Sequence, residues 1–505
     1  MTASTDIVGD GQSSVASDGS PGTSPQVDPR RWLALGIIAI AQLMVVLDAS
    51  IVTIALPHAQ ADLGISTADR QWVMTAYTLA FGGLLLLGGR IADFLGRKRI
   101  FIWGLIGFAG ASALGGAAPN AEFLFAARAL QGACAALLAP AALSLITVTF
   151  TEGKERARAF GVYGGISGGG AAIGLIVGGL LTEYASWRWC LLVNIPIALA
   201  AAAAALPIVR ESKAEGKASY DIPGAVTVTA GLVALVYGFT VAAEDGWGSA
   251  TTIGLLVGSA VLLAAFVVIE TRTKAPLLPM RVPLERNRGG SFLASLLIGG
   301  GLFAMFLFLT FYFQSTLGYS ALRSGFAFLP FSVGIIVSAG LSSQFLPRVG
   351  PKALMIGGSV LAVAGLLLLS QIGVDSSYVA LVLPAELLIS FGMGFAFVPM
   401  SSVSLLGVAE HDAGVASALV NTTQQVGGSL GVALLNTVYA TAVTDYLTSH
   451  GTGPAAQAQA AVEGYTTSFL WSAALIALAL ISVIVLVRAG RDDVPQGDGI
   501  PIHAG

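Results

Sequence analysis

The chain has 505 residues, of which 55% are hydrophobic and 10% are charged, and its net charge is −3. Its mean hydropathy is +0.81. Water-soluble proteins have about a quarter charged residues, so this composition excludes that class and indicates an integral membrane protein. The small negative charge gives no reason to expect a nucleic-acid partner.

Residues 1–29 are rich in Ser, Gly, Asp and Pro and contain no basic residue. We expect a disordered tail there rather than a cleaved signal peptide. From Trp32 onward, long apolar runs alternate with short polar connections, and each run can cross a hydrocarbon core about 30 Å thick as a helix. The runs predict fourteen transmembrane helices, near residues 32–56, 70–89, 100–118, 122–148, 158–182, 189–209, 222–243, 251–269, 289–314, 324–346, 353–372, 378–404, 414–440 and 466–487.

The distribution of Lys and Arg predicts the orientation of these helices. An even number of spans places both termini on one side of the membrane. Most basic residues fall in the tails and in the connections on that side. The exceptions are Arg70, Arg188 and Arg323 in opposite connections and Arg128 within a span. By the positive-inside rule, we expect both termini in the cytoplasm.

The connection between the second and third spans, GGRIADFLGRKRI, has four cationic side chains and one aspartate. Its basic residues suit any cytoplasmic loop. Orientation alone does not explain Asp93, nor the flanking Gly89 and Gly96. The turn is therefore a candidate functional element.

A weaker copy of this turn, SQFLPRVGPKAL, occurs eight spans later. Aligning Gly96-Arg97-Lys98 with Gly350-Pro351-Lys352 places Pro347 opposite Asp93. Many secondary transporters are built from such internal repeats. Two six-helix halves would give an offset of six spans, so we expect two additional helices between them.

The sequence therefore predicts an all-α integral membrane fold with 14 transmembrane helices, in two pseudo-symmetric six-helix bundles plus two extra central helices. The expected division is a cytoplasmic tail at 1–29, an N-terminal bundle at 30–210, inserted helices at 222–269, a C-terminal bundle at 289–487 and a second cytoplasmic tail at 488–505.

Three ionisable residues fall inside predicted spans, where each costs roughly 2.5–3.5 kcal/mol on insertion scales. Asp48, Arg128 and Glu386 all lie about 10–12 Å below the outer surface at 1.5 Å per residue. We expect Asp48 to interact with Arg128. We also expect Asp48, Glu386 or both to exchange protons, because a carboxyl group in an apolar cavity titrates near neutrality.

Two further groups of residues are candidates for packing or substrate contact. Glycines recur on one face of the fifth span and permit close approach of a neighbouring helix; they are Gly170, Gly174, Gly178 and Gly179. Polar and aromatic residues in spans nine and thirteen suit a cavity for a lipophilic substrate. Hydrogen bonding between helices explains the polar ones at least as well, and core packing or a lipid-facing position is the more common outcome for the aromatic ones. These are Phe306, Tyr312, Asn421 and Gln424.

Several motifs together resemble the major facilitator superfamily, and within it the fourteen-helix drug/proton antiporter subfamily. GRIADFLGRK resembles the family's signature turn, with Gly89, Asp93, Gly96, Arg97 and Lys98 at the expected positions. Four other segments are similar to motifs of the first, second, fourth and sixth helices: LDASIVTIALP, WVMTAYTLA, RALQG and WRWCLLVNIP.

The resemblance implies alternating access, with the signature turn acting as a gate on the inner side. It also implies efflux driven by protons. One position departs from the pattern, because GAAIGLIVGG has Leu175 where the antiporter motif has proline. The glycine face remains, while the bend that proline imposes is in doubt.

No phosphate-binding loop, nucleophile elbow or zinc pattern occurs, so we expect no enzyme activity, cofactor or metal, and a proton gradient as the energy source. The sequence favours a monomer in the bacterial cytoplasmic membrane that exports a lipophilic, often cationic, drug or secondary metabolite in exchange for protons. The alternative is gradient-driven uptake of a small nutrient by symport.

Overall fold

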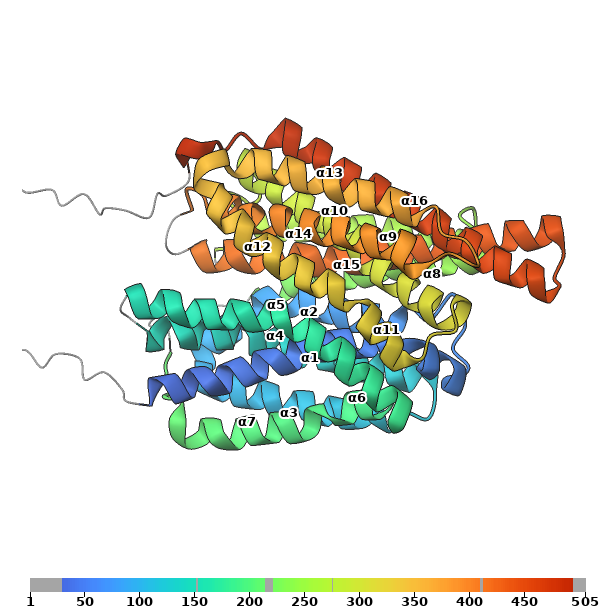
Figure 1. Ribbon diagram of the computed structural model, residues 1–505. Helices are drawn as coiled ribbons and strands as arrows, with labels where there is room; N and C mark the ends of the chain where they lie inside the picture. Colours follow the sequence, from blue (N-terminus) through green and yellow to red (C-terminus); the bar gives the residue numbers. More distant parts are fainter. Residues whose placement is uncertain (1–29, 151–152, 214–220, 275, 409–411, 494–505) are drawn as a thin grey trace, which may run out of the picture.

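A computed structural model describes residues 30–150, 153–213, 221–274, 276–408 and 412–493 (Figure 1). The predicted tail at 1–29 and most of the one at 488–505 lie outside these residues. The described part of the chain is helical and contains no strand. The α-helices are α1 (Arg31–Leu63), α2 (Trp72–Leu95), α3 (Arg97–Gly116), α4 (Ala121–Thr149), α5 (Gly153–Tyr184), α6 (Trp189–Leu192), α7 (Asn194–Ile208), α8 (Ile222–Asp245), α9 (Ala250–Arg272), α10 (Arg286–Phe311), α11 (Ala321–Ala327), α12 (Leu329–Val349), α13 (Pro351–Leu369), α14 (Leu383–Ser404), α15 (Ala413–His450) and α16 (Pro454–Leu486).

Thirteen helical stretches in the described residues are long and apolar enough to cross a membrane, and α5 adds a shorter apolar stretch, Gly170–Tyr184. The protein is therefore a multi-pass membrane protein. Two spans begin or end in a π-helical turn, at Tyr312–Thr316 after α10 and at Tyr378–Val382 before α14.

The sequence prediction was wrong about residues 441–465, which it treated as a connection. There α15 and α16 continue beyond the apolar runs and form a helical hairpin that projects from one end of the molecule (Figure 1). Gly451, at φ 83°, ends α15, and Pro454 begins α16. Hydropathy detects spans and not helices outside the bilayer, so a hairpin rich in Ala, Gln and Thr is not recognised.

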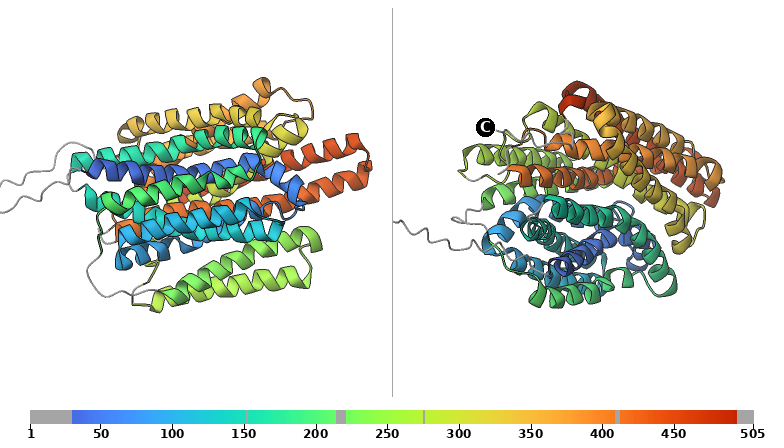
Figure 2. Two further views of the ribbon diagram at one scale, coloured as in Figure 1. Left: turned by 90° about the horizontal axis from the view of Figure 1, so that it is seen from below. Right: turned by 60° about the vertical axis from the view of Figure 1, so that its left-hand side comes forward.

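Helix contacts divide the chain into two bundles, which Figure 2 shows from two further directions. In the first bundle, α1–α7, the main contacts are α2 with α4, α1 with α5, and α3 with α4 and α7. In the second bundle, α10–α16, they are α10 with α15 and α16, and α14 with α12 and α13. The pair α8 and α9 packs together, and α8 also contacts both α2 and α15.

Small residues allow this close packing. A methyl group at Gly132 of α4 would overlap with the carbonyl oxygen of Tyr77 on α2, and one at Gly427 of α15 would overlap with that of Leu296 on α10. In lipid, helices associate through van der Waals contact rather than hydrophobic burial, so small residues at such crossings matter more than apolar ones.

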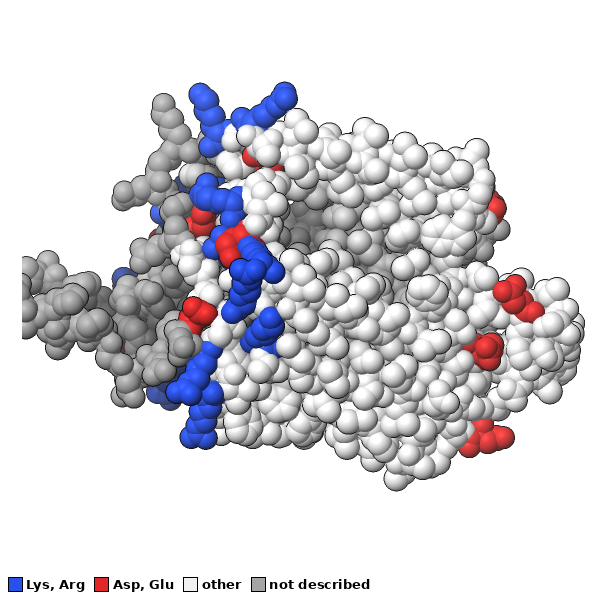
Figure 3. All heavy atoms as spheres, turned by 90° about the horizontal axis from the view of Figure 1, so that it is seen from above, with Lys and Arg blue, Asp and Glu red and all other residues white. Residues whose placement is uncertain are grey.

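Lys and Arg side chains gather at one end of the molecule, while the other end shows scattered Asp and Glu (Figure 3). We call the first the basic end; it includes the turn between α2 and α3 at Gly96, the connection between α9 and α10, and residues 488–493 after α16. We call the other the opposite end; it includes the connections at 64–71, 117–120, 312–320 and 451–453.

Hydrogen bonds between the two bundles, among the described residues, lie in the half of the molecule nearer the opposite end. Gln314 donates to the Ile54 carbonyl oxygen at 2.9 Å, and the backbone N–H of Leu322 donates to Glu183 at 3.0 Å. Thr78 and Ser429 share a buried hydrogen bond further along α2. These hydrogen bonds therefore join the two bundles toward the opposite end.

We expect Gly427→Ala to destabilise the protein by about 1–3 kcal/mol, because its methyl group would push α15 away from α10. The measurement is the midpoint of thermal unfolding in detergent. Gly340→Ala is the control, since a Cβ atom there would meet nothing within 4 Å. Equal midpoints for the two variants would contradict the packing seen here.

Candidate functional site

A buried hydrogen-bond network centred on Asp48 lies inside the first bundle. Asp48 on α1 is 0% exposed and Arg128 on α4 is 2% exposed. The Arg128 Nη1 atom is 2.6 Å from Asp48 Oδ2. Asp48 Oδ1 accepts from the side-chain amides of Asn194, at 2.8 Å, and Gln131, at 3.1 Å. Three side chains thus donate N–H groups to this one carboxylate.

The guanidinium of Arg128 is also held on its other sides. Its Nε donates to the Val73 carbonyl oxygen at 3.0 Å, and its Nη1 donates to Gln131 Oε1 at 2.8 Å. The ring of Tyr77 lies 4.5 Å from its central carbon. The network therefore joins α1, α2, α4 and α7. A change in the charge of Asp48 would alter hydrogen bonds to all four helices.

Sequence reasoning paired Asp48 with Arg128 but missed the residues that hold them. Gln131, Asn194 and Tyr77 lie inside motifs already noted, namely RALQG, WRWCLLVNIP and WVMTAYTLA. Their positions inside these motifs could have identified them as candidates for the site. Ser112, which accepts from Gln131 at 2.7 Å, lies in α3 and has no such signal.

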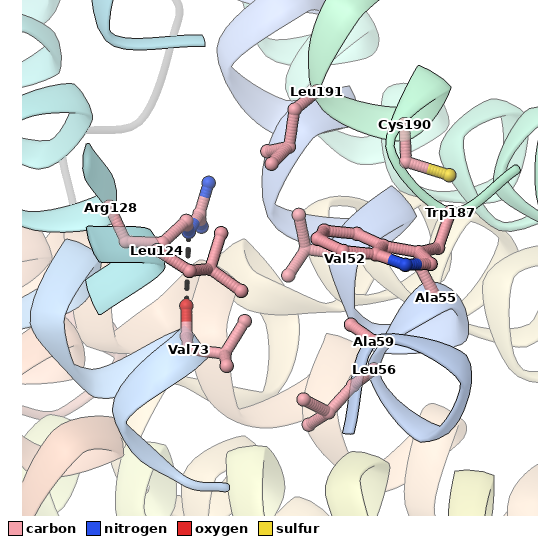
Figure 4. A pocket seen from close by; sticks show the side chains of 10 residues that line it. All are labelled: Val52, Ala55, Leu56, Ala59, Val73, Leu124, Arg128, Trp187, Cys190 and Leu191. Carbon is pink, nitrogen blue, oxygen red and sulfur yellow. Dashed lines mark hydrogen bonds between the residues drawn. The ribbon is translucent and has the colours of Figure 1, made fainter. Parts of the chain in front are cut away.

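A small apolar pocket borders Arg128 (Figure 4). Its other walls are side chains of α1, α2, α4 and α6 and of Trp187. The indole of Trp187 donates to Asp62 at 3.0 Å, and Arg188 pairs with the same carboxylate at 3.2 Å. An apolar shell thus separates the Asp48–Arg128 pair from the opposite end.

Glu386 is buried in the first turn of α14 and is not brought together with Asp48. Its Oε1 atom has no hydrogen-bond partner, and its Oε2 atom accepts only a long bond, 3.4 Å, from the Tyr378 hydroxyl. That hydroxyl makes a shorter bond to the Ala327 carbonyl oxygen, at 2.7 Å. Among the described residues, no ion pair includes Glu386, so its carboxyl group is buried without a cationic partner.

The signature turn is held by the segment that follows α7. Asp93 pairs with Arg97 one helical turn later, with Nε at 2.9 Å. Glu211 accepts from the backbone N–H groups of Lys98 and Arg99 and so caps α3. Gly96 adopts φ 117°, and a Cβ atom there would lie 2.8 Å from Glu211.

The weaker copy of the turn has the same anchoring in the second bundle. Lys98 donates to the Leu206 carbonyl oxygen at 2.6 Å, near the end of α7. Lys352 donates to the Ile484 carbonyl oxygen at 2.9 Å, near the end of α16. Gly350, at φ 86°, occupies the place of Gly96. The alignment of the two turns is thus reproduced in space, apart from the acid.

The glycine face of α5 contacts two helices rather than one. Gly170, Gly174 and Gly178 pack on α1, against Leu43, Ser50 and Ile51 respectively, whereas Gly179 packs against Leu322 of α11. Leu175 does not interrupt α5, which is one continuous helix. Its carbonyl oxygen lies against Gly325 of α11.

The candidate substrate contacts separate into two groups. Asn421 is exposed, Gln424 is half-buried, and Phe306 is half-buried against Phe328 and Phe331. Tyr312, by contrast, is 0% exposed, and its hydroxyl donates to the Gly373 carbonyl oxygen at 2.8 Å. Tyr312 is thus packed in the core of the second bundle in this structure, and its contact with substrate stays a prediction. In the described part of the chain, no group of three His, Cys, Asp or Glu side chains is placed to hold a metal.

Two helical bundles that bury charged residues between membrane-spanning helices are typical of membrane transporters. A family model, described as the Major Facilitator Superfamily, matches residues 38–432. The chain belongs to that family.

Its relatives include a puromycin resistance protein and a cephamycin export protein. The chain is 51% identical over 463 residues to the puromycin resistance protein pur8 of Streptomyces alboniger, covering 91% of this chain and 92% of that protein. It is 41% identical to the cephamycin export protein CmcT of Amycolatopsis lactamdurans, covering 80% and 84%. Among solved structures, a bacterial homolog of the human lysosomal transporter Spinster, in an inward-facing and unoccupied conformation, has a TM-score of 0.64 at 16% identity, covering 93% and 100%. That likeness concerns the fold alone.

We expect Asp48→Asn or Arg128→Gln alone to destabilise the protein by about 3–5 kcal/mol, because each leaves the other group buried without its partner. The double variant should lose less stability than the sum of the losses in the two single variants. Thermal unfolding in detergent measures all three.

The control for this cycle is Asp62→Asn, because the Asp62 side chain is 52% exposed; we expect about 1 kcal/mol or less there. Strictly additive losses at Asp48 and Arg128 would show that their contact carries no coupling.

Proposed function

We propose that the protein exports a small lipophilic, often cationic, drug or secondary metabolite such as an antibiotic across the bacterial cytoplasmic membrane in exchange for protons, by alternating access. The observation that carries this proposal is the 51% identity to a puromycin resistance protein over 91% of the chain. The similarity to a cephamycin export protein supports outward transport. Symport of a nutrient is the competing outcome in the test below.

The proposal places the basic end in the cytoplasm, since Lys and Arg are retained on that side. Both termini are then cytoplasmic, and α5 counts as the fourteenth span. On this assignment residues 30–210 and 289–487 are the two moving halves, and residues 222–269 are inserted between them. A structure closed at the opposite end is then inward-facing.

Proton coupling is assigned to the network around Asp48. A proton added to the carboxylate would remove the negative charge that neutralises Arg128, which is held by the Val73 carbonyl oxygen on α2. The guanidinium would then have to move or find another acceptor, because a buried unpaired cation is costly. In this way protonation would change the packing of α4 against α1 and α2. Glu386 is the second proton-binding candidate, on the other half.

The signature turn is assigned to gating at the basic end. In the present state Asp93 is paired with Arg97 within the same turn. When the basic end closes, the acid and its neighbouring cations, Arg97 and Lys98, would engage the second half. Pro347 at the equivalent position of the other turn leaves this lock on one half only. Substrate would pass between the halves along Phe306, Asn421 and Gln424, and the protein would function as a monomer.

Inverted membrane vesicles with an imposed pH gradient test this function. We expect puromycin to dissipate the gradient only when the protein is present, and Asp48→Asn to abolish this effect, because the variant has no carboxylate to protonate. Asp445→Asn, on the exposed part of the projecting hairpin, is the matched control.

Dissipation at the normal rate with Asp48→Asn would remove Asp48 from the mechanism. Substrate uptake into whole cells with acidification of the cytoplasm would instead favour symport.

We expect Asp93→Asn to lower the turnover of export by about tenfold or more while leaving insertion and orientation intact, because topology depends on the basic residues and not on this acid. Export by cells measures turnover, and labelling of a terminal cysteine with an impermeant reagent measures orientation. Full transport activity in this variant would reduce the turn to an orientation signal.

A further inference from the structure

Arg70 lies in the connection between α1 and α2, where the sequence predicts only an outer loop residue. The structure buries it, at 3% exposure. Its guanidinium carbon lies 4.2 Å from the ring centre of Phe311, 4.6 Å from that of Tyr439 and 5.8 Å from that of Phe308. Arg70 belongs to the first bundle, whereas the rings belong to α10 and α15 of the second. The side chain therefore crosses between the bundles.

Asn436 of α15 completes this contact from the second bundle. Its side-chain oxygen accepts from Arg70 Nε at 3.2 Å. Its side-chain nitrogen donates to the carbonyl oxygens of Thr67, at 2.8 Å, and Ala68, at 3.2 Å. The side-chain oxygen and nitrogen of Asn436 therefore both bind the connection between α1 and α2.

The two buried arginines, Arg70 and Arg128, differ in one decisive respect. Arg128 pairs with Asp48, but none of the ion pairs among the described residues includes Arg70. Burial lowers the pKa of Arg70 from its ordinary value, although a guanidinium remains charged. Burial removes the water around the Arg70 guanidinium. Contacts with aromatic rings and one amide compensate for that loss less completely than a carboxylate would. Arg70 can therefore leave for water without breaking an ion pair.

The residues next to these partners bind the inserted helix α8. Gln71 donates to Thr240 Oγ1 at 2.7 Å, and Thr437 donates to the Phe239 carbonyl oxygen at 2.8 Å. Both acceptors lie on α8. The first bundle, the second bundle and α8 therefore meet at Arg70–Gln71 and Asn436–Thr437.

We propose that Arg70 is the releasable latch of the opposite end, which holds the two bundles closed through Phe311, Tyr439 and Asn436, with α8 bracing both sides. The latch rests on the alternating access of the proposed function. It opens when the bundles separate at this end and Arg70 becomes hydrated, and it closes when the aromatic cage forms again around the guanidinium. Arg70 acts by positioning the bundles and need not touch substrate.

Distances between spin labels at the opposite end test the latch without any substrate. The labels are attached through Ala61→Cys on α1 and Thr444→Cys on α15, both at exposed positions, after Cys134→Ala and Cys190→Ala. We expect a closed population in the otherwise unchanged protein. Arg70→Gln should raise the ratio of open to closed molecules by about tenfold, as expected for the loss of cation–π contacts and one hydrogen bond. Arg70→Lys should lie between the two.

The matched control is Arg323→Gln, which removes a cation of the same end whose aromatic partner, Tyr319, belongs to its own bundle; its distances should not change. If Arg70→Gln does not fold, Phe311→Leu with Tyr439→Leu removes the ring faces and should give the same opening.

Unchanged distances in folded Arg70→Gln, or in the ring variant, would overturn the latch. Failure of export by the unchanged protein would overturn the proposed function. The distances between the labels would still decide whether Arg70 holds the two bundles together.

Discussion

A carboxylate and a guanidinium buried together between membrane helices must satisfy each other, because lipid offers no hydrogen bonds and water is excluded. Asp48 and Arg128 do so at 2.6 Å, and the surrounding arrangement follows from this requirement. Asn194 and Gln131 supply the remaining donors to the carboxylate. The first bundle is therefore organised around one charge pair, and a proton is the smallest change that can disturb it.

The second bundle is organised differently. Its buried acid, Glu386, has no cation and only a long hydrogen bond, and its centre is aromatic, with Phe308, Tyr439 and Tyr465 in mutual contact. This aromatic cluster receives a cation, Arg70, from the first bundle. The two halves thus have similar turns but differ in their buried contacts, with a charge pair in the first bundle and an aromatic cluster in the second.

The sequence was informative where a residue type is costly at its position. Charged residues in apolar runs identified Asp48, Arg128 and Glu386, and the turn motif predicted the spatial equivalence of Lys98 and Lys352 that the anchoring contacts show. It was uninformative for residues that are ordinary in sequence. Tyr312 is one of many aromatics, and hydropathy treats the projecting hairpin as a loop because its helices are not apolar.

By itself, the sequence determined the membrane class, the approximate spans and the family, because hydropathy, charge asymmetry and short motifs are local properties of the chain. Only the tertiary structure decided which helices meet. It placed Asn194 beside Asp48, 146 residues away in the chain, and placed Arg70 beside Asn436, 366 residues away. A loop arginine and a buried arginine look alike in a sequence, since burial depends on what the distant parts of the chain bring to it.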